Sequence, residues 1–560
     1  MPLQVRKESV FCLDFTRLQD NDFNPYDVTV PEIVYKKCAS NRIAFAFDSE
    51  KAGLTFGAVQ SDMESFAAGL LATGLQAGDR ILIAGYNVSQ VVVTALGAAR
   101  AGLVFGLANP NFSSSDQLQH LLLAGNFKAV ILFAPGKDVD APHKLMLQIA
   151  PELTNSPKGK LSTESLPSLT HVILADEDHK HAGTWTLSEI YGKATKIKIE
   201  KLPDYKQWNP HKLAAIGFTL GSTGLPKAFG LSHYQLVNGA RLAAMAIGID
   251  DSTVLCCALP LFRLPVFALV AFTPFLLESK SVFSEPSPIP RNLFACIKKY
   301  QATTVLSNAA ALRLGLRLFF THKVLLPSVS TVILLGERVN AELLLSVDRV
   351  MPNASRIAVG MLLTEAGGIP ILSDNTTNLV KYVGKPLDAY PIELIPVEKL
   401  TRKRADIGEL RLHPLMNTKF MGQGPEFKEY SDFIDTGDVV IHTPEGNIEI
   451  LCHKDDIIYD RHDNLVEHWR LEKAMAAYEG IKGIQVLQVC PGAPVVAVIV
   501  PRNFECVPEF IKNDLCQLCR NADVSLPDKV AVVDDFPRVN TKIQKFKLRQ
   551  ILNANLLTLY

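Results

Sequence analysis

Short apolar runs alternate with amphipathic stretches over most of the chain up to about residue 390. Four of these runs are rich in Val, Ile and Leu: Arg80–Ala84, Ala129–Phe133, His171–Leu174 and Thr331–Leu335. Continuous apolar runs between helical patterns are typical of parallel strands that are buried on both faces of a sheet. The pattern therefore predicts an α/β fold that is built on parallel sheets.

Closer to the C-terminus the pattern becomes shorter and alternating, as in Glu409–Leu412, which favours a small β-barrel-like part. It changes again after about Leu451, where strand-like runs such as Ile484–Val489 indicate a compact α+β unit. At 560 residues the chain exceeds what one hydrophobic core usually supports. We therefore expect two domains, residues 1–450 and 451–560.

The longest apolar segment, residues 254–277, is long enough to cross a bilayer. Arg263 and the prolines at positions 260, 265 and 274 interrupt it. A buried strand followed by a buried helix explains this pattern better than a membrane span does.

Composition limits the partners and the compartment. The charges balance, with 57 Lys and Arg against 57 Asp and Glu, so they give no reason to expect nucleic acid or an anionic membrane as a partner. Ten scattered cysteines indicate free thiols in a reducing compartment. The first twenty residues lack a continuous apolar core, and the chain does not end in Ser-Lys-Leu. We expect no transmembrane segment and a cytoplasmic location, with the peroxisome and the mitochondrion left open.

The segment Phe218–Lys227 places glycines, hydroxyls, a proline and a lysine directly after the apolar run Leu213–Ile216. Glycines let backbone N–H groups converge on anionic oxygens, and hydroxyl and ammonium groups add further donors. Ala228 follows the lysine, so the segment is not a Walker loop. The segment predicts a polyphosphate-binding loop at the end of a strand, with an ordinary Gly/Ser turn as the plainer alternative.

This segment resembles the phosphate loop of the adenylate-forming superfamily, which includes acyl-CoA synthetases, firefly luciferase and peptide-synthetase adenylation domains. Further stretches resemble the family's motifs in the same order along nearly the whole chain: Leu259–Phe262, Thr364–Glu365, Gly408–Leu410, Thr436–Asp438 and Thr541–Arg549. The last of them is most similar to fatty acyl-CoA synthetases. The resemblance implies an adenylation domain with two parallel-type αβα sheets and a small β-barrel-like part, followed by a smaller α+β lid domain.

The family joins a carboxylate to ATP, releases pyrophosphate and passes the acyl group to a thiol, so the resemblance implies ATP, Mg²⁺ and coenzyme A. By this resemblance the β- and γ-phosphates would be held by Thr219, Gly221, Ser222, Thr223, Gly224 and Lys227. Thr364 would contact the α-phosphate and Glu365 would hold Mg²⁺. Asp438 would bind the ribose, and Lys542 would bridge the carboxylate and the α-phosphate. Taken singly, Glu365 could be a solvated acid, Asp438 a turn residue and Lys542 part of a solvated basic run.

The resemblance also places Gly336 and Met361 beside the nucleotide, and it implies three residues near the acyl group: Phe262, Arg263 and Ala309. Met361 stands where the family usually has an aromatic ring that stacks on adenine, and the loss of stacking costs about 0.5–1.5 kcal/mol. Arg263 replaces a frequent histidine. A cation there could pair with the substrate carboxylate or simply occupy the pocket.

The strongest departures from the family lie near residue 453. Cys452 and His453 stand where the family has a Gly-Arg pair whose arginine contacts the nucleotide. An imidazole cannot make the bidentate contacts of a guanidinium, and a charge-assisted hydrogen bond contributes about 1.5–3 kcal/mol. Arg461 and His462 stand near a turn that is usually Gly-Gly, and Thr541 replaces the glycine before Lys542.

Together these motifs favour an ATP-dependent acid:CoA ligase that acts on an apolar, fatty or aryl carboxylic acid. The alternative is an impaired or inactive homologue that binds an acyl or nucleotide ligand or a protein partner. A third possibility is that adenylation survives while thioester formation does not. The identity of the acid and the oligomeric state are left open.

Overall fold

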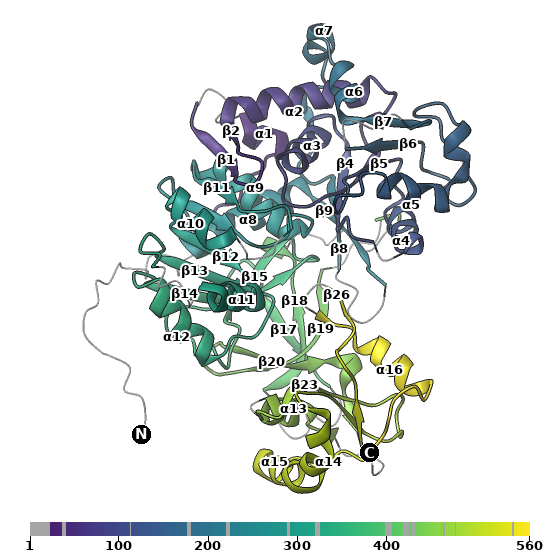
Figure 1. The fold of residues 1–560 in the computed structure, drawn as a ribbon. Helices are drawn as coiled ribbons and strands as arrows, with labels where there is room; N and C mark the ends of the chain where they lie inside the picture. The colour runs from purple at the N-terminus through teal and green to yellow at the C-terminus, as the bar shows by residue number, and fades with distance from the viewer. Residues whose placement is uncertain are drawn as a thin grey trace.

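The computed structural model describes the chain in these ranges: 23–35, 41–112, 114–175, 181–219, 225–287, 292–319, 325–397, 406–417, 425–427, 432–460, 462, 465–476, 478–539 and 542–560. A large part runs from α1 (Val30–Tyr35) to β20 (Ile448–His453). A small part, from β21 (Ile458–Tyr459) to α16 (Lys545–Asn553), lies beneath it in Figure 1.

One sheet of the large part has seven strands in the order β7-β6-β5-β3-β4-β8-β9. All neighbours are parallel except β8 and β9, which pair antiparallel. Its strands are β3 (Arg80–Ala84), β4 (Val104–Ala108), β5 (Ala129–Leu132), β6 (His171–Leu174), β7 (Thr184–Thr186), β8 (Leu213–Phe218) and β9 (Ala228–Ser232). The sequence-predicted runs of this region are therefore confirmed as parallel strands.

A second sheet has nine strands in the order β16-β15-β14-β13-β12-β10-β11-β1-β2. It is parallel from β14 to β1 and antiparallel at both edges. Its strands are β1 (Ile43–Phe47), β2 (Ala52–Thr55), β10 (Val254–Cys257), β11 (Lys280–Phe283), β12 (Thr304–Ser307), β13 (Thr331–Leu335), β14 (Arg356–Leu363), β15 (Gly368–Leu372) and β16 (Lys385–Pro386).

Helices between the two sheets form the largest hydrophobic core, which joins strands of both. These helices are α2 (Phe56–Leu71), α3 (Ser89–Arg100), α8 (His233–Ile247) and α9 (Leu264–Leu277). Helix α8 begins at a capping box, in which the Ser232 side chain accepts from the Gln235 N–H, and ends at Gly248 in the left-handed conformation. The apolar segment 254–277 is a buried strand followed by a buried helix, as predicted, although Pro274 lies within α9 and does not interrupt it.

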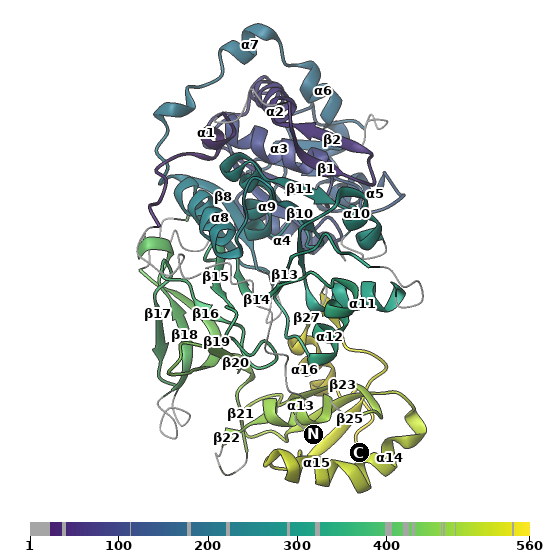
Figure 2. The same cartoon turned by 90° about the vertical axis from the view of Figure 1, so that its left-hand side faces the viewer.

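Other helices cover the outer faces of the sheets (Figures 1 and 2). Helices α4 (Ser115–Gly125) and α5 (Ala141–Ile149) lie over the seven-stranded sheet. Helices α10 (Leu293–Tyr300), α11 (Ala309–Phe319) and α12 (Ala341–Val350) lie over the nine-stranded one. Helices α6 (Leu187–Gly192) and α7 (Lys196–Glu200) project from the top in Figure 1. The predicted α/β class is confirmed.

The predicted β-barrel-like part is a four-stranded antiparallel sheet in the order β17-β18-β19-β20. Its strands are β17 (Ile392–Ile395), β18 (Ile407–Leu412), β19 (Ile434–His442) and β20. Within the described residues its edge strands do not pair with each other, so it is an open sheet rather than a closed barrel. The expected boundary near Leu451 falls within β20, and the division into two domains stays a prediction.

The small part is an α+β unit around the three-stranded sheet β23-β24-β25. Helices α13 (His468–Ala476) and α15 (Leu515–Ala522) pack on one side of this sheet and α16 on the other. The other strands and α-helices are β22 (Leu465–Val466), β23 (Ile481–Leu487), β24 (Val496–Pro501), α14 (Val507–Glu509), β25 (Lys529–Val532), β26 (Arg538–Val539) and β27 (Lys542–Ile543). The hairpin of β26 and β27 reaches towards the large part (Figures 1 and 2).

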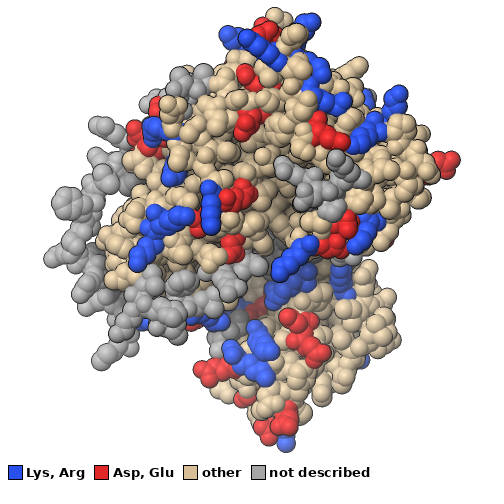
Figure 3. Space-filling view, turned by 45° about the horizontal axis from the view of Figure 1, so that its top comes forward, with Lys and Arg blue, Asp and Glu red and all other residues tan. Residues whose placement is uncertain are grey.

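Two further properties bear on partners. In the part of the chain that the structure describes, no helix is both long enough and apolar enough to cross a bilayer. Basic and acidic side chains are interspersed on the face shown in Figure 3, as the balanced charge of the sequence leads one to expect.

Candidate active site

The base of the predicted phosphate loop is closed by a reciprocal pair of hydrogen bonds between β8 and β9. The Thr219 N–H donates to the Lys227 carbonyl at 3.0 Å, and the Lys227 N–H donates to Thr219 Oγ1 at 3.0 Å. A ring nitrogen of His120 on α4 lies 2.8 Å from the Pro226 carbonyl and braces the same turn. The centre of the loop lies outside the described residues and includes four predicted phosphate ligands: Gly221, Ser222, Thr223 and Gly224. Their role stays a prediction.

Thr364 contacts this loop base from the turn that follows β14. Its hydroxyl donates to the Phe218 carbonyl at 3.4 Å. A Cβ added to Gly217 would lie only 2.5 Å from Thr364 Cγ2, so the absence of a side chain there allows the approach. Two motifs whose contacting residues lie 146 positions apart in the sequence therefore meet, and Glu365, which follows Thr364, is half-buried.

The candidate acyl-side residues gather at the carboxyl ends of β10, β12 and β13. Arg263 is half-buried, and its Nη1 lies 3.5 Å from the position that a Cβ on Gly336 would take. Glu337 Oε2 accepts from the Ala310 N–H at 2.8 Å, at the start of the helix that carries Ala309. Burial lowers the pKa of Arg263 to about 10, while the carboxylates of Glu337 and Glu365 act to raise it. Arg263 therefore stays a cation at neutral pH among carboxylates. The sequence indicates residues 334–339, and so Glu337, as pocket lining by position alone and assigns this acid no role.

A buried asparagine fixes the turn that carries Phe262 and Arg263. The Asn87 side chain donates to the Leu259 carbonyl at 2.9 Å and accepts from the Leu261 N–H at 2.7 Å. The ring of Phe262 lies 6.5 Å from that of Tyr86. Asn87 is only 2% exposed, so this tie holds the turn firmly against the connection between β3 and α3.

Met361 is buried in β14. It is 8% exposed and packs with Ile371, Leu410, Val440 and Ile448 in a core between the nine-stranded and four-stranded sheets. Burial against aliphatic neighbours is what a flexible thioether provides well. Its predicted place beside adenine stays a prediction.

Asp438 and His453 stand opposite each other on β19 and β20. The register pairs the two residues directly, and the imidazole of His453 packs against Gly437. His453 Nδ1 accepts from the Asp455 N–H at 3.3 Å. Gly437 has φ +74°, a conformation that glycine adopts without strain. The structure therefore places His453, which the resemblance aligns with the family's nucleotide-contacting arginine, opposite the candidate ribose ligand Asp438.

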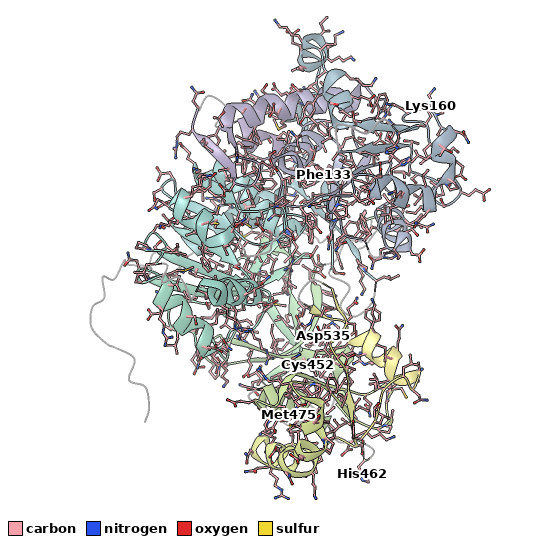
Figure 4. All side chains as sticks on the ribbon, viewed as in Figure 1. Phe133, Lys160, Cys452, His462, Met475 and Asp535 are labelled. Atoms are coloured by element: carbon pink, nitrogen blue, oxygen red, sulfur yellow. The ribbon has the colours of Figure 1, made fainter. Side chains whose placement is uncertain are left out.

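Lys542 lies in β27, at the end of the hairpin that reaches towards the large part. Cys452 lies where the two parts meet (Figure 4). Burial, together with the nearby carboxylate of Asp456, raises the pKa of Cys452 to about 12, so it is a neutral thiol.

Glu365 suits a magnesium ion that arrives with a nucleotide. Within the described ranges, no group of three or more His, Cys, Asp or Glu side chains forms a ready-made metal site. Mg²⁺ is commonly held by one or two carboxylates together with substrate phosphates. A single oxygen ligand beside the base of a phosphate loop matches that arrangement.

With this geometry in place, the comparisons with known proteins identify the family. Residues 34–414 match the model of the AMP-binding enzymes. This is more than half of the chain, so the protein belongs to that family, and the predicted membership in the adenylate-forming superfamily is confirmed.

The particular relatives are acyl-CoA ligases. The human mitochondrial medium-chain acyl-CoA ligase is 24% identical over 90% of this chain and 84% of its own length. The crab-eating macaque (Macaca fascicularis) protein of the same name is 32% identical over 36% of this chain. That match covers 33% of the macaque protein.

Two solved structures share the fold over nearly the whole chain. An anthranilate CoA ligase in complex with anthranoyl-AMP has a TM-score of 0.77 at 17% identity and covers 95% of this chain and 99% of its own. A Mycobacterium tuberculosis fatty acyl CoA synthetase has a TM-score of 0.69 at 19% identity and covers 94% of this chain and 99% of its own. At these identities the comparison establishes the fold.

Proposed function

We propose that the protein is an AMP-forming acid:CoA ligase that activates an apolar, fatty or aryl carboxylic acid with ATP and transfers the acyl group to coenzyme A. The observation that carries this proposal is the contact of Thr364 with the base of the phosphate loop, which brings two family motifs into one site. Membership in the AMP-binding family and the names of the acyl-CoA ligase relatives support it.

The chemistry needs two anions to be held together. A carboxylate is a poor electrophile, so one of its oxygens attacks the α-phosphorus of ATP, and the bond to the pyrophosphate oxygen breaks. The Lys227 ammonium and the loop donors would hold the β- and γ-phosphates, and Thr364 would hold the α-phosphate. Mg²⁺ held by Glu365 would supply charge stabilisation on the phosphate oxygens. Most of the catalysis is then positioning and electrostatics.

Arg263 and Lys542 would act on the carboxylate. The Arg263 cation lies beside Gly336, which has no side chain to block an acid from the backbone. Lys542, in β27 of the small part, would bridge the carboxylate and the α-phosphate. The thiol of coenzyme A then attacks the acyl carbon, and AMP leaves with the electrons of the broken acyl–oxygen bond.

The test is acid-dependent exchange of pyrophosphate into ATP. Fatty and aryl acids should each be assayed with and without Mg²⁺. Lys542→Ala should lower the exchange rate by roughly a hundredfold or more. Lys547→Ala removes an exposed lysine of α16 and is the matched control, which should keep the wild-type rate. Absence of exchange with every acid would count against the proposal.

Two further measurements separate the alternatives. Release of AMP with and without coenzyme A distinguishes full ligase activity from adenylation alone. Calorimetry with a nonhydrolysable acyl-adenylate mimic distinguishes a working nucleotide site from an inactive homologue.

The compartment is part of the same proposal: the sequence favours the cytoplasm, whereas the relatives are named as mitochondrial. Cell fractionation decides between them.

A further inference from the structure

A short turn between the large and small parts is held from both sides. The residues Lys454–Asp456 form one 3-10 turn directly after β20. Lys454 Nζ lies 2.8 Å from Glu409 Oε1 on β18, in the large part. Two residues later, Asp456 Oδ1 lies 2.6 Å from Arg549 Nη2 on α16, in the small part. Two residues of one turn therefore form ion pairs with different parts of the molecule, Lys454 with the large part and Asp456 with the small part.

The contacts of Asp456 with the small part belong to a network of ion pairs and hydrogen bonds. Lys545 Nζ lies 3.5 Å from both Asp456 Oδ2 and Glu472 Oε1. Glu472 Oε1 also accepts from the Val486 N–H at 2.9 Å, which ties α13 to β23. Arg549 Nε donates to the Gln488 carbonyl at 3.2 Å. Asp456 is the acid that connects this network to the turn.

The network is partly shielded from water. The Asp456 side chain is 11% exposed and that of Lys545 is 19% exposed. His468 is fully buried close by. Burial acts to raise the pKa of Asp456, but Lys545 and Arg549 more than offset it, so the pKa lies below its ordinary value and the group is ionised. Removing one partner of a buried pair leaves the other unpaired, which costs more than losing a surface pair.

The chain then leads directly from this network to Lys542. Lys545 is three residues after Lys542, and the Gln544 N–H between them donates to the Pro537 carbonyl at 2.8 Å. Residues 542–545 therefore end one hairpin and begin α16, so a shift of Lys545 moves the β26–β27 hairpin. A displacement of about 1 Å at a reacting group can cost roughly a hundredfold in rate.

We propose that Asp456 is a positioning residue for Lys542: through Lys545 and Arg549 it sets where the hairpin that carries Lys542 stands relative to the turn after β20. The inference rests on the proposed function for its effect on adenylation, but the placement of the hairpin can be measured without activity. Asp456 acts through other residues and does not contact the reacting groups.

The experiment uses the full chain with Asp456→Asn, which keeps the side-chain shape and removes the charge. Exchange of pyrophosphate should fall about tenfold or more in kcat, with KM for ATP changed less than threefold. Formation of the thioester from a synthetic acyl-adenylate and coenzyme A should change less than threefold, because that step does not use Lys542. Asp456→Glu should recover much of the exchange rate.

Two controls keep the test specific. Glu467→Gln removes an exposed ion pair with Arg470 in the same small part and should leave both half-reactions unchanged. Lys545→Gln should reproduce the effect of Asp456→Asn, and the double variant should be no worse than either single variant, because the two residues act as one unit.

Hydrogen exchange supplies the readout that does not depend on activity. Amides of residues 542–549 should exchange about tenfold faster in folded Asp456→Asn than in the wild type. Unchanged exchange of these amides would overturn the inference, and so would an equal fall of both half-reactions. A wild-type protein without pyrophosphate exchange would instead overturn the proposed function, and the amide measurement would still judge the role of Asp456.

Discussion

The two sides of the proposed active site are built differently. On the side of the phosphate loop, position is set by backbone contacts: β8 pairs with β9, and Gly217 lets Thr364 approach the strand. On the side of the small part, position is set by charged side chains that converge on the turn Lys454–Asp456. The first arrangement depends on close packing, and the second depends on ion pairs between two parts of the chain.

This difference indicates which kinds of substitution each side of the site tolerates. A backbone contact in a close-packed sheet is lost only when something is inserted, because the surrounding core keeps the strands in place. An ion-pair network is lost when one charge is removed, because its partners are then left unpaired. The departures from the family at residues 452 and 453 lie on the second side.

The largest expected effect tests the packed side. Gly217→Ala introduces a Cβ that would lie 2.5 Å from Thr364 Cγ2, so either the strand or Thr364 must move. We expect pyrophosphate exchange to fall by about a hundredfold. The control is Gly136→Ala, where a Cβ would meet nothing within 4 Å and activity should stay. Equal rates for the two variants would show that the approach of Thr364 does not matter.

The next expected effect is a pH dependence of the free energy of unfolding, and it arises from a buried histidine in the large part. His233, at the start of α8 in the large part, accepts from the Val30 N–H at 3.2 Å, and burial lowers its pKa to about 4. A histidine is usually near 6.5 in an unfolded chain, so the unfolded state binds the proton first as pH falls. Stability is therefore complete above about pH 6.5 and declines by about 1.4 kcal/mol per pH unit down to about pH 4, a loss of roughly 3 kcal/mol in all.

Chemical denaturation at several pH values measures this slope. His233→Asn keeps an acceptor near the Val30 N–H but cannot be protonated in this range, so its slope should be smaller by that amount. If the variant keeps the full slope between pH 6.5 and 4, other groups in the protein dominate its acid response.

A smaller effect tests the charged side. His453→Arg restores the residue type of the family at a position opposite Asp438. A charge-assisted hydrogen bond contributes about 1.5–3 kcal/mol, so the KM for ATP should fall about tenfold or more. His462→Arg adds the same charge in an exposed turn and should leave this KM unchanged. An unchanged KM in His453→Arg would mean that the imidazole is not the weak point of nucleotide binding.

The local parts of this fold were readable from the sequence. The runs at Arg80–Ala84 and Thr331–Leu335 are strands because continuous apolar residues suit a strand that is buried on both faces. The segment 254–277 is a strand and a helix because Pro260 separates the two and Pro265 suits the first turn of α9, whereas Pro274 lies within that helix and does not end it. The order of the strands was not readable, since crossovers depend on which helix faces pack together.

The long-range contacts of the site were likewise hidden. Asn87 binds the turn at Leu261 across 174 residues, and nothing in its local sequence marks it. The basic run from Lys545 to Arg549 has the pattern of a solvated helix face, yet both of these residues pair with Asp456. The hydrophobic pattern of a helix predicts which of its residues face solvent. It does not predict which distant residue a side chain pairs with, because that depends on how another part of the chain packs against the helix.

The smallest expected effect concerns the contact between Gly437 and His453, where the packed and the charged sides meet. Gly437→Ala should lower the free energy of unfolding by about 1–2 kcal/mol, because φ is +74° and an added Cβ would also meet the imidazole. Adding His453→Ala removes the second cause and leaves the first. If thermal unfolding of the double variant, measured against His453→Ala alone, shows the same loss, backbone strain explains it and the imidazole is free to move. If the loss disappears, the ring itself holds β20 against β19, and His453 has a packing role that an arginine at this position would have to replace.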